Sequence, residues 1–185
     1  PTSFSRLKTS WDFPSDYTYS IKYLEENRPD SKIIYEVKGG VSVAYEHYLF
    51  GKDKFKGYLG AEIMFGKASN MTMAFHSLYF MPTYPIDNDT QITFKIGYTN
   101  LNSSVDLPQT HGFMLAIGPE IKISENWAIH FSSTWYEMFD KVLSPGEINS
   151  LFINPEGEVS EADIGIIYDK LAISLIYGFD REKKE

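Results

Sequence analysis

Large apolar residues alternate with small or polar ones along most of the chain. Between Leu171 and Phe179 every second residue is large and apolar, and the positions between them are mostly small. Successive side chains of a β-strand point to opposite faces, so this run predicts a strand with one apolar face and one cramped face. Similar runs recur from Ile33 onward, one of them with an ambiguous phase around Pro82. The chain is therefore expected to be a succession of short amphipathic strands.

Connections rich in turn-forming residues separate these runs. The expected connections are Gly51–Phe55, Gly66–Met71, Tyr84–Asp89, Asn100–His111, Ser124–Asn126, Asp140–Ser160 and Asp169–Lys170. Two of them can be tested against the faces. A loop at 169–170 places Tyr168 opposite Leu171, and a loop at 124–126 places Ile123 opposite Trp127, so apolar residues pair in both hairpins.

The fold predicted from this pattern is all-β, an antiparallel up-and-down β-barrel of about eight strands. Residues 33–179 form the barrel. Residues 1–32 form an N-terminal segment, in which the alternation from Tyr17 to Tyr23 favours one or two additional strands. Residues 180–185 form a charged tail.

Alternation alone leaves open whether the apolar face points outward to lipid or inward to a dry core. Glycines on the polar face favour a narrow interior, because a glycine weakens a strand unless it relieves crowding. They are Gly60, Gly97, Gly118, Gly165 and Gly178. Aromatic residues gather toward the ends of the apolar runs, which is typical of the interfacial girdles of membrane barrels. The predicted lipid-facing girdle is Trp127, Trp135, Phe139, Tyr98, Phe65, Tyr168, Tyr177 and Phe179.

The opposite face carries charged residues, which would then pair inside the barrel. The predicted interior polar residues are Glu46, Glu62, Lys95, Glu120, Lys122, His130, Glu161 and Asp163. Eight strands leave no open channel once side chains fill the interior.

Composition is consistent with this interpretation. Aromatic residues make up 16% of the chain and charged residues 23%, as expected when polar side chains are enclosed. The net charge of −8 argues against a nucleic-acid partner. The absence of cysteine excludes disulfides and thiolate metal sites. No signal peptide precedes the first strand in this sequence, so we expect one to be absent or already removed.

The strand–turn–strand units resemble the small outer-membrane β-barrel family of bacteria, the opacity-protein and porin-like group. The residues that carry the resemblance are Phe113–Glu137 (FMLAIGPEIKISENWAIHFSSTWYE) and Ile164–Phe179 (IGIIYDKLAISLIYGF), the second ending in alternating hydrophobics and an aromatic. The resemblance implies a bacterial outer-membrane location and membrane lipids as partners. The chain departs from the family in two ways: six residues follow Phe179, and eight strands counted from Ile33 put the short turns opposite the termini.

Candidate catalytic groups are few. His130 and Ser132 share a face and resemble a pair in lipid A deacylase barrels, but Glu137 lies on the other face, so no local triad forms. His76 and Ser77 are adjacent and face opposite ways. His47 and His111 have no partner at ligand spacing, so neither a metal site nor a cofactor is predicted.

The function predicted from the sequence is a non-enzymatic outer-membrane barrel without an open pore. Its role would be structural or surface-interacting, with other envelope proteins as further partners. Two alternatives remain open: a soluble lipocalin-like barrel that binds an apolar ligand, and a lipid-modifying barrel enzyme that uses His130.

Overall fold

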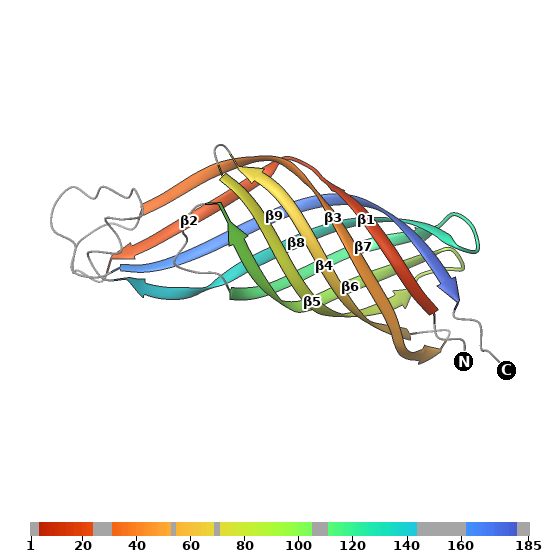
Figure 1. Ribbon diagram of the computed structural model, residues 1–185. Coiled ribbons are helices and arrows are strands. Elements are labelled where there is room, and N and C mark those ends of the chain that lie inside the picture. The colour runs from red at the N-terminus through yellow and green to blue at the C-terminus, as the bar shows by residue number, and fades with distance from the viewer. Residues whose placement is uncertain are drawn as a thin grey trace.

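The strands close into an antiparallel barrel (Figure 1). This computed structural model describes residues 4–23, 31–52, 55–68, 71–104, 111–143 and 162–180, which contain no helix. The strands are β1 (Phe4–Asp12), β2 (Ser15–Tyr23), β3 (Ser31–Lys52), β4 (Phe55–Ala68), β5 (Met71–Pro85), β6 (Thr90–Ser103), β7 (His111–Lys122), β8 (Trp127–Leu143) and β9 (Ala162–Asp180). The predicted all-β antiparallel barrel is confirmed.

Eight positions make up the wall, because β1 and β2 share one of them. Both strands pair with β3 on one side and with β9 on the other. Asp12 pairs with Gly40 and Ser15 with Val37, so β1 and β2 keep a single register on β3 across the interruption at Phe13 and Pro14. From β3 to β9 each strand pairs with the next, which closes the ring.

The hairpin predicted at Asp169 and Lys170 is wrong. Both residues lie within β9, where they pair with Trp135 and Thr134 of β8. The strand that the hairpin was meant to supply comes instead from β1 and β2, so the wall begins at Phe4 rather than at Ile33. The pair of charges resembles a turn only locally, because the groups that hold Lys170 lie on distant strands.

Because β9 continues through Asp169 and Lys170, the termini and the short turns can be assigned to one end of the barrel. The end at which β1 begins and β9 ends also holds the connections 53–54, 86–89 and 123–126, and we call it the terminus end. The hairpin at Ile123 is confirmed there, since the Ile123 amide donates to the Trp127 carbonyl at 2.8 Å. The longer connections, 24–30, 104–110 and 144–161, join strands at the opposite end, which we call the loop end. Short turns and termini thus share one end, as in outer-membrane barrels.

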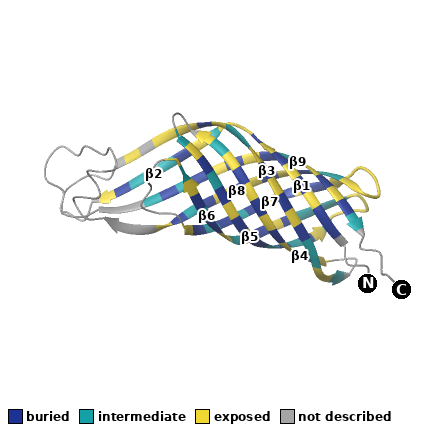
Figure 2. Cartoon of the chain, in the orientation of Figure 1, coloured by how far each residue is buried: buried dark blue, intermediate teal, exposed yellow. Residues whose placement is uncertain are grey.

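Burial alternates along the strands, with apolar side chains exposed and charged ones enclosed over the terminus-end part of the wall (Figure 2). Leu175 is 44% exposed and Phe94 45%, whereas Lys95 is 4% exposed. The apolar face of these strands therefore points outward, the orientation favoured by the glycines of the polar face and by the aromatic residues near the ends of the apolar runs.

Glycines allow strands and side chains to approach closely inside this wall. A Cβ on Gly60 would clash with the ring of Tyr79, and one on Gly118 with the carbonyl oxygen of Phe131. Gly165, predicted to share this face, lies on the other side of β9 from the buried Ile166, because β9 continues where a turn was expected. Gly39 has φ of +121° at a register shift between β3 and β4, a backbone conformation that glycine adopts without strain.

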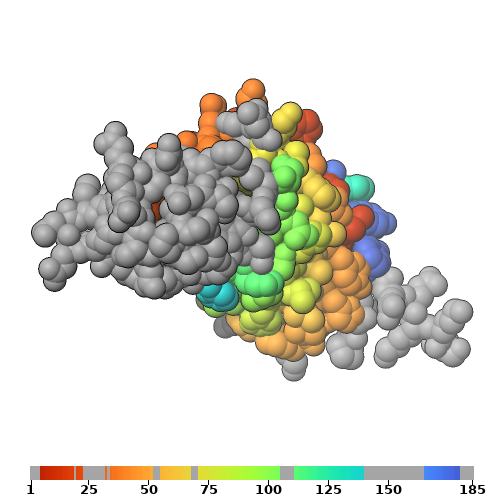
Figure 3. All heavy atoms as spheres, turned by 60° about the vertical axis from the view of Figure 1, so that its left-hand side comes forward, coloured from red at the N-terminus to blue at the C-terminus, as the bar shows by residue number. Residues whose placement is uncertain are grey.

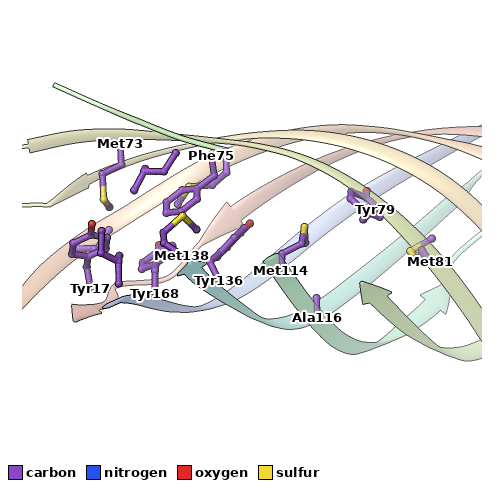
Figure 4. Close-up of a cluster of buried hydrophobic side chains, with 14 of the residues drawn as sticks. Tyr17, Met73, Phe75, Tyr79, Met81, Met114, Ala116, Tyr136, Met138 and Tyr168 are labelled. Carbon is purple, nitrogen blue, oxygen red and sulfur yellow. The ribbon is translucent and has the colours of Figure 1, made fainter. Parts of the chain in front are cut away.

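Toward the loop end the barrel is filled by an apolar cluster (Figure 4). Phe75 stacks on Tyr168 at 5.4 Å between ring centroids and lies 4.6 Å from Tyr136. Methionines from several strands surround these rings, among them Met64, Met73, Met114 and Met138. Because these side chains are essentially inaccessible to water, the loop-end half of the interior is closed.

Candidate functional site: the barrel interior and its outer face

Arg6 on β1 is the centre of the charged half of the interior. Its guanidinium donates to both carboxylate oxygens of Glu120 on β7, at 2.9 and 2.8 Å. It also donates to Glu46 on β3, at 2.9 Å from Nε and 2.7 Å from Nη2. Gln91 on β6 donates to Glu120 at 2.6 Å. The guanidinium therefore ties opposite sides of the wall together through charge-assisted bonds.

Lys95 on β6 extends this network toward the loop end. Its ammonium lies 3.4 Å from Glu46 and 3.1 Å from Glu62 on β4. It also sits 3.9 Å from the ring centre of Tyr79, whose hydroxyl donates to Glu46 at 2.8 Å. The two glutamates are thus bridged by a cation that itself rests on an aromatic face.

Lys170 on β9 forms the last part of the network. It donates to Asp12 on β1 at 3.0 Å and lies 3.6 Å from Glu62. The hydroxyl of Tyr136, at the edge of the apolar cluster, donates to Glu62 at 3.5 Å. A continuous set of polar contacts therefore runs from Gln91 to Lys170 and meets the apolar cluster.

The enclosed charges balance among the described residues. Arg6, Lys8, Lys95 and Lys170 are offset by Asp12, Glu46, Glu62 and Glu120. Each of these residues is at most 5% exposed. Burying charge is tolerated when partners and hydrogen bonds are supplied together, so the arrangement can act as a polar core that closes the barrel.

His130 on β8 is buried, and both of its ring nitrogens are occupied. Nδ1 lies 2.9 Å from the Lys8 ammonium, and Nε2 lies 2.7 Å from the Thr93 hydroxyl. Neither partner is a carboxylate, so the geometry differs from a histidine base oriented by an acid. Ser132 is also buried, in the same wall. The pair is thus placed inside the barrel, where His130 serves as a hydrogen-bond link.

A polar vestibule opens at the terminus end, with a volume of about 740 Å³. Arg6 and Glu120 form part of its lining, together with Gln91 and turn residues such as Asp87. The prediction that Lys122 lies in the interior is wrong. This residue is exposed at the end of β7 and lines the open vestibule. The vestibule therefore ends on the charged network.

The outer face of the terminus-end part of the wall carries many exposed apolar side chains. Trp127 is 43% exposed, Trp135 39%, and Trp11, which the sequence reasoning did not single out, 69%. Trp127 and Trp135 are separated by about 27 Å along β8 at about 3.4 Å per residue. At a tilt of about 40° this spans about 20 Å of height, close to the apolar band of a membrane barrel.

The other residues predicted for this face are placed as follows. Phe65, Tyr98, Phe139 and Tyr177 are exposed, and Phe179 is partly exposed. Tyr168 is buried in the apolar cluster, so its predicted outward position is wrong. The cause is again the absent hairpin: without a turn, Tyr168 and Leu171 face opposite sides of β9. Glu161 and the side chain of Asp163, predicted to be interior, lie outside the described parts of the structure.

The sequence reasoning missed Arg6, Lys8, Asp12 and Lys170. A signal for the first three is present, because polar residues at positions 6, 8, 10 and 12 alternate with Leu7, Thr9 and Trp11. Lys170 was hidden by its assignment to a turn. The partners of all four could not be identified without the closed barrel.

Within the described residues, no helix is both long and apolar enough to cross a membrane. No group of histidine and acidic residues among them could hold a metal ion.

Comparison with known proteins identifies the fold. No family model matches the sequence, and no curated protein is significantly similar. Solved structures do match over nearly the whole chain. Outer membrane protein OprG from Pseudomonas aeruginosa has a TM-score of 0.54 at 11% identity, with 97% of each chain covered. Outer membrane protein AlkL, solved in lipid bilayers, has a TM-score of 0.52 at 9% identity, covering 100% of this chain and 93% of that one.

The outer membrane protease OmpT from Escherichia coli has a TM-score of 0.50 at 11% identity, covering 95% of this chain and 97% of that one. The similarity therefore includes a protease as well as outer membrane proteins whose names state no activity. At such identities it shows the fold alone: the chain has the fold of small outer-membrane β-barrels.

Proposed function

We propose that this chain is a sealed β-barrel of the bacterial outer membrane, with a structural or surface-interacting role and no enzymatic activity. The observation that supports this most directly is the pairing of an apolar outer belt with an enclosed network of balanced charges. Arg6, buried to 3% exposure, faces the interior, while its neighbour Leu7 is 45% exposed. In water this arrangement would expose the apolar belt, whereas in a bilayer both faces are satisfied.

The proposal is tested by reconstituting the chain. We expect it to stay monodisperse only in detergent or lipid, and to give no steady ion conductance in planar bilayers, because side chains fill the interior. A chain that stays monodisperse in plain buffer would contradict membrane residence, and a stable unitary conductance would contradict the sealed interior.

The soluble, lipocalin-like alternative requires an apolar cavity. The interior instead holds tightly packed rings toward the loop end and ion pairs toward the terminus end. The open space at the terminus end is bordered by Arg6, Glu120 and turn residues. Titration with a fluorescent fatty acid analogue should therefore show no saturable binding to the detergent-solubilised protein.

The lipid-modifying alternative depends on His130. Its contacts to Lys8 and Thr93 favour a packing role. We expect unchanged lipid A acylation in cells that express the protein, with His130→Asn as the control variant. Acylation that changes with the native chain and not with His130→Asn would contradict the proposal.

A further inference from the structure

The inward and outward faces exchange between β1 and β2, at Phe13 and Pro14. On β1 the side chains of Arg6 and Lys8 point inward, and Trp11 points outward. On β2 the order is reversed, since Tyr17 and Ile21 are buried. The outward positions of β2 are polar: Asp16, Thr18, Ser20 and Lys22.

A bulge causes this exchange. Asp12 pairs with Ala172 and Tyr17 with Tyr168, so the stretch 13–16 opposes the shorter stretch 169–171 of β9. One extra residue shifts the alternation, as expected of a β-bulge. The neighbouring strand β3 has a register shift against β4 between Val37 and Gly40. Val37 is buried there, and Val41 is exposed.

The outward residues of other strands change character at corresponding places. On three strands a large apolar residue is followed toward the loop end by a polar one: Phe65 by Lys67, Tyr98 by Asn100, and Leu171 by Asp169. On β8 the polar Glu137 lies between the exposed Trp135 and Phe139. Beyond this line the described outer face of β2, β4, β6 and β9 is mostly polar, while Ile34 on β3 and Phe139 on β8 are exposed apolar residues. The interior there is filled by the part of the apolar cluster around Tyr17 and Tyr168 (Figure 4). The barrel thus has the pattern of a membrane protein on one side of the line and of a water-soluble protein on the other.

Lys38 and Lys67 lie next to each other on this line. Val37 pairs with Ala68 and Gly40 with Gly66, which places Lys67 against the bulge that contains Lys38. Both side chains are exposed. Figure 3 shows the outer surfaces of β3 to β6 side by side, as bands from orange to green. Among the described residues neither lysine forms an ion pair.

Charge is unevenly distributed along the line. The carboxylates Asp16, Glu137 and Asp169 lie on β2, β8 and β9, whereas the two lysines lie on β3 and β4. Glu36 is the next outward residue of β3, one step farther from the apolar belt. A lysine at the edge of the hydrocarbon can keep its stem on apolar surface and extend its ammonium to the phosphate level.

We propose that the lipid-contacting belt ends at the Phe13–Pro14 interruption and that Lys38 and Lys67 bind phosphate groups of anionic lipids in the loop-side leaflet. The part of the barrel beyond this line then stands in water. This inference rests on the proposed function, since it requires a chain that spans a bilayer.

The position of the boundary is tested with two matched single-cysteine variants, because the chain contains no cysteine. Thr9 lies on β1 and Thr18 on β2, both on the outer face. Thr9→Cys and Thr18→Cys therefore place the same label on either side of the interruption. Each variant carries a nitroxide label in phosphatidylcholine vesicles. We expect label 9 to collide mainly with oxygen, which concentrates in hydrocarbon, and label 18 mainly with a water-soluble nickel chelate. Equal accessibility of the two labels would overturn the boundary.

The lysines are tested by lipid selectivity. Tryptophan quenching by brominated phosphatidylglycerol is compared with quenching by brominated phosphatidylcholine for wild type, Lys38→Gln/Lys67→Gln and the control Lys56→Gln/Lys122→Gln. The control lysines are exposed at the terminus end. We expect wild type to prefer the anionic lipid by about fivefold per lysine, the control to keep this preference, and the test variant to lose it.

The possible outcomes distinguish a failure of the lysine site from a failure of the membrane location. A test variant that keeps the wild-type preference would overturn the phosphate site, as would an equal loss in the control. If no lipid quenches any variant, the proposed membrane location itself fails. Strong quenching without selectivity leaves the membrane location standing and overturns only the lysine site.

Discussion

Arg6 and Glu120 are 114 residues apart in the sequence and meet inside the barrel in a two-pronged ion pair. The contact joins β1 to β7, which are not neighbours in the wall. It therefore crosses the interior, and it closes the passage that the terminus-end vestibule would otherwise continue. The same guanidinium also donates to Glu46, its pairing partner on the adjacent strand β3.

Replacing Arg6 with Leu should strongly destabilise the barrel. The change leaves Glu46 and Glu120 enclosed without their main cation, and removing one partner of a buried pair typically costs about 3–5 kcal/mol. The free energy of unfolding, measured by urea titration in lipid with tryptophan emission, should fall by about this amount. Lys122→Leu, at an exposed position of the same end, is the control and should change it little. Equal values for the two variants would show that the network does not stabilise the barrel.

Gly118 should tolerate no larger residue. An added Cβ would clash with the carbonyl oxygen of Phe131 on the adjacent strand β8, and backbone cannot yield as a flexible side chain can. Gly118→Ala is expected to lower the free energy of unfolding by about 1–3 kcal/mol. At Gly66 the nearest atom is the terminal methyl carbon of Met64, at 3.0 Å, so Gly66→Ala should cost clearly less. The reverse order in thermal or urea unfolding would contradict the packing.

The turn between β5 and β6 should respond to acid. The amides of Asp89 and Thr90 donate to the Asp87 carboxylate at 2.9 and 2.8 Å and hold the pKa of this carboxyl below its ordinary value of 3.8. A lowered pKa means that the ionised form stabilises the turn above the ordinary value, and that this contribution is lost as pH falls through the lowered pKa. The carbon-13 shift of the carboxyl should titrate below 3.8. A midpoint at or above that value would show that these hydrogen bonds do not form.

Insertion of Gly-Ser between Asp169 and Lys170 should prevent folding. The two residues lie in the middle of β9, and the insertion would displace Lys170 from Asp12. The same insertion between Glu125 and Asn126, in the connection from β7 to β8, should be tolerated. The folded fraction can be followed by the gel mobility of unheated samples. If the 169/170 variant folded, this would support the hairpin predicted from the sequence and contradict a continuous β9.

Alternation was sufficient to predict the strands and to separate the two faces of most of them, whereas the outward orientation of the apolar face was predicted from the glycines and the aromatic residues. Phe94 and Lys95 illustrate why: their opposite faces are fixed by strand geometry, whatever the neighbours are. The predicted number of strands was close for a different reason. The prediction left out the wall position that β1 and β2 share, and it divided β9 into two strands by a false turn. Asp169 and Lys170 resemble a turn because a local pattern does not show that Asp12 and Glu62 can receive the lysine.

The interior network could not be predicted from the sequence. Its contacts join residues such as Arg6 and Glu120, or Asp12 and Lys170, whose proximity depends on barrel closure. The exchange of faces at Pro14 was likewise hidden, because Tyr17 and Ile21 suggest an ordinary apolar stripe. Only pairing with β9 shows that this stripe lies on the other side of the wall.

Tryptophan fluorescence tests the orientation of the apolar face most directly. The chain has three tryptophans, Trp11, Trp127 and Trp135, and all are exposed on the outer face of the barrel. In vesicles whose acyl chains carry bromine, all three single-tryptophan variants should be strongly quenched, and aqueous acrylamide should quench them weakly. Emission that bromine leaves unchanged while acrylamide quenches it would mean that the apolar face does not meet lipid.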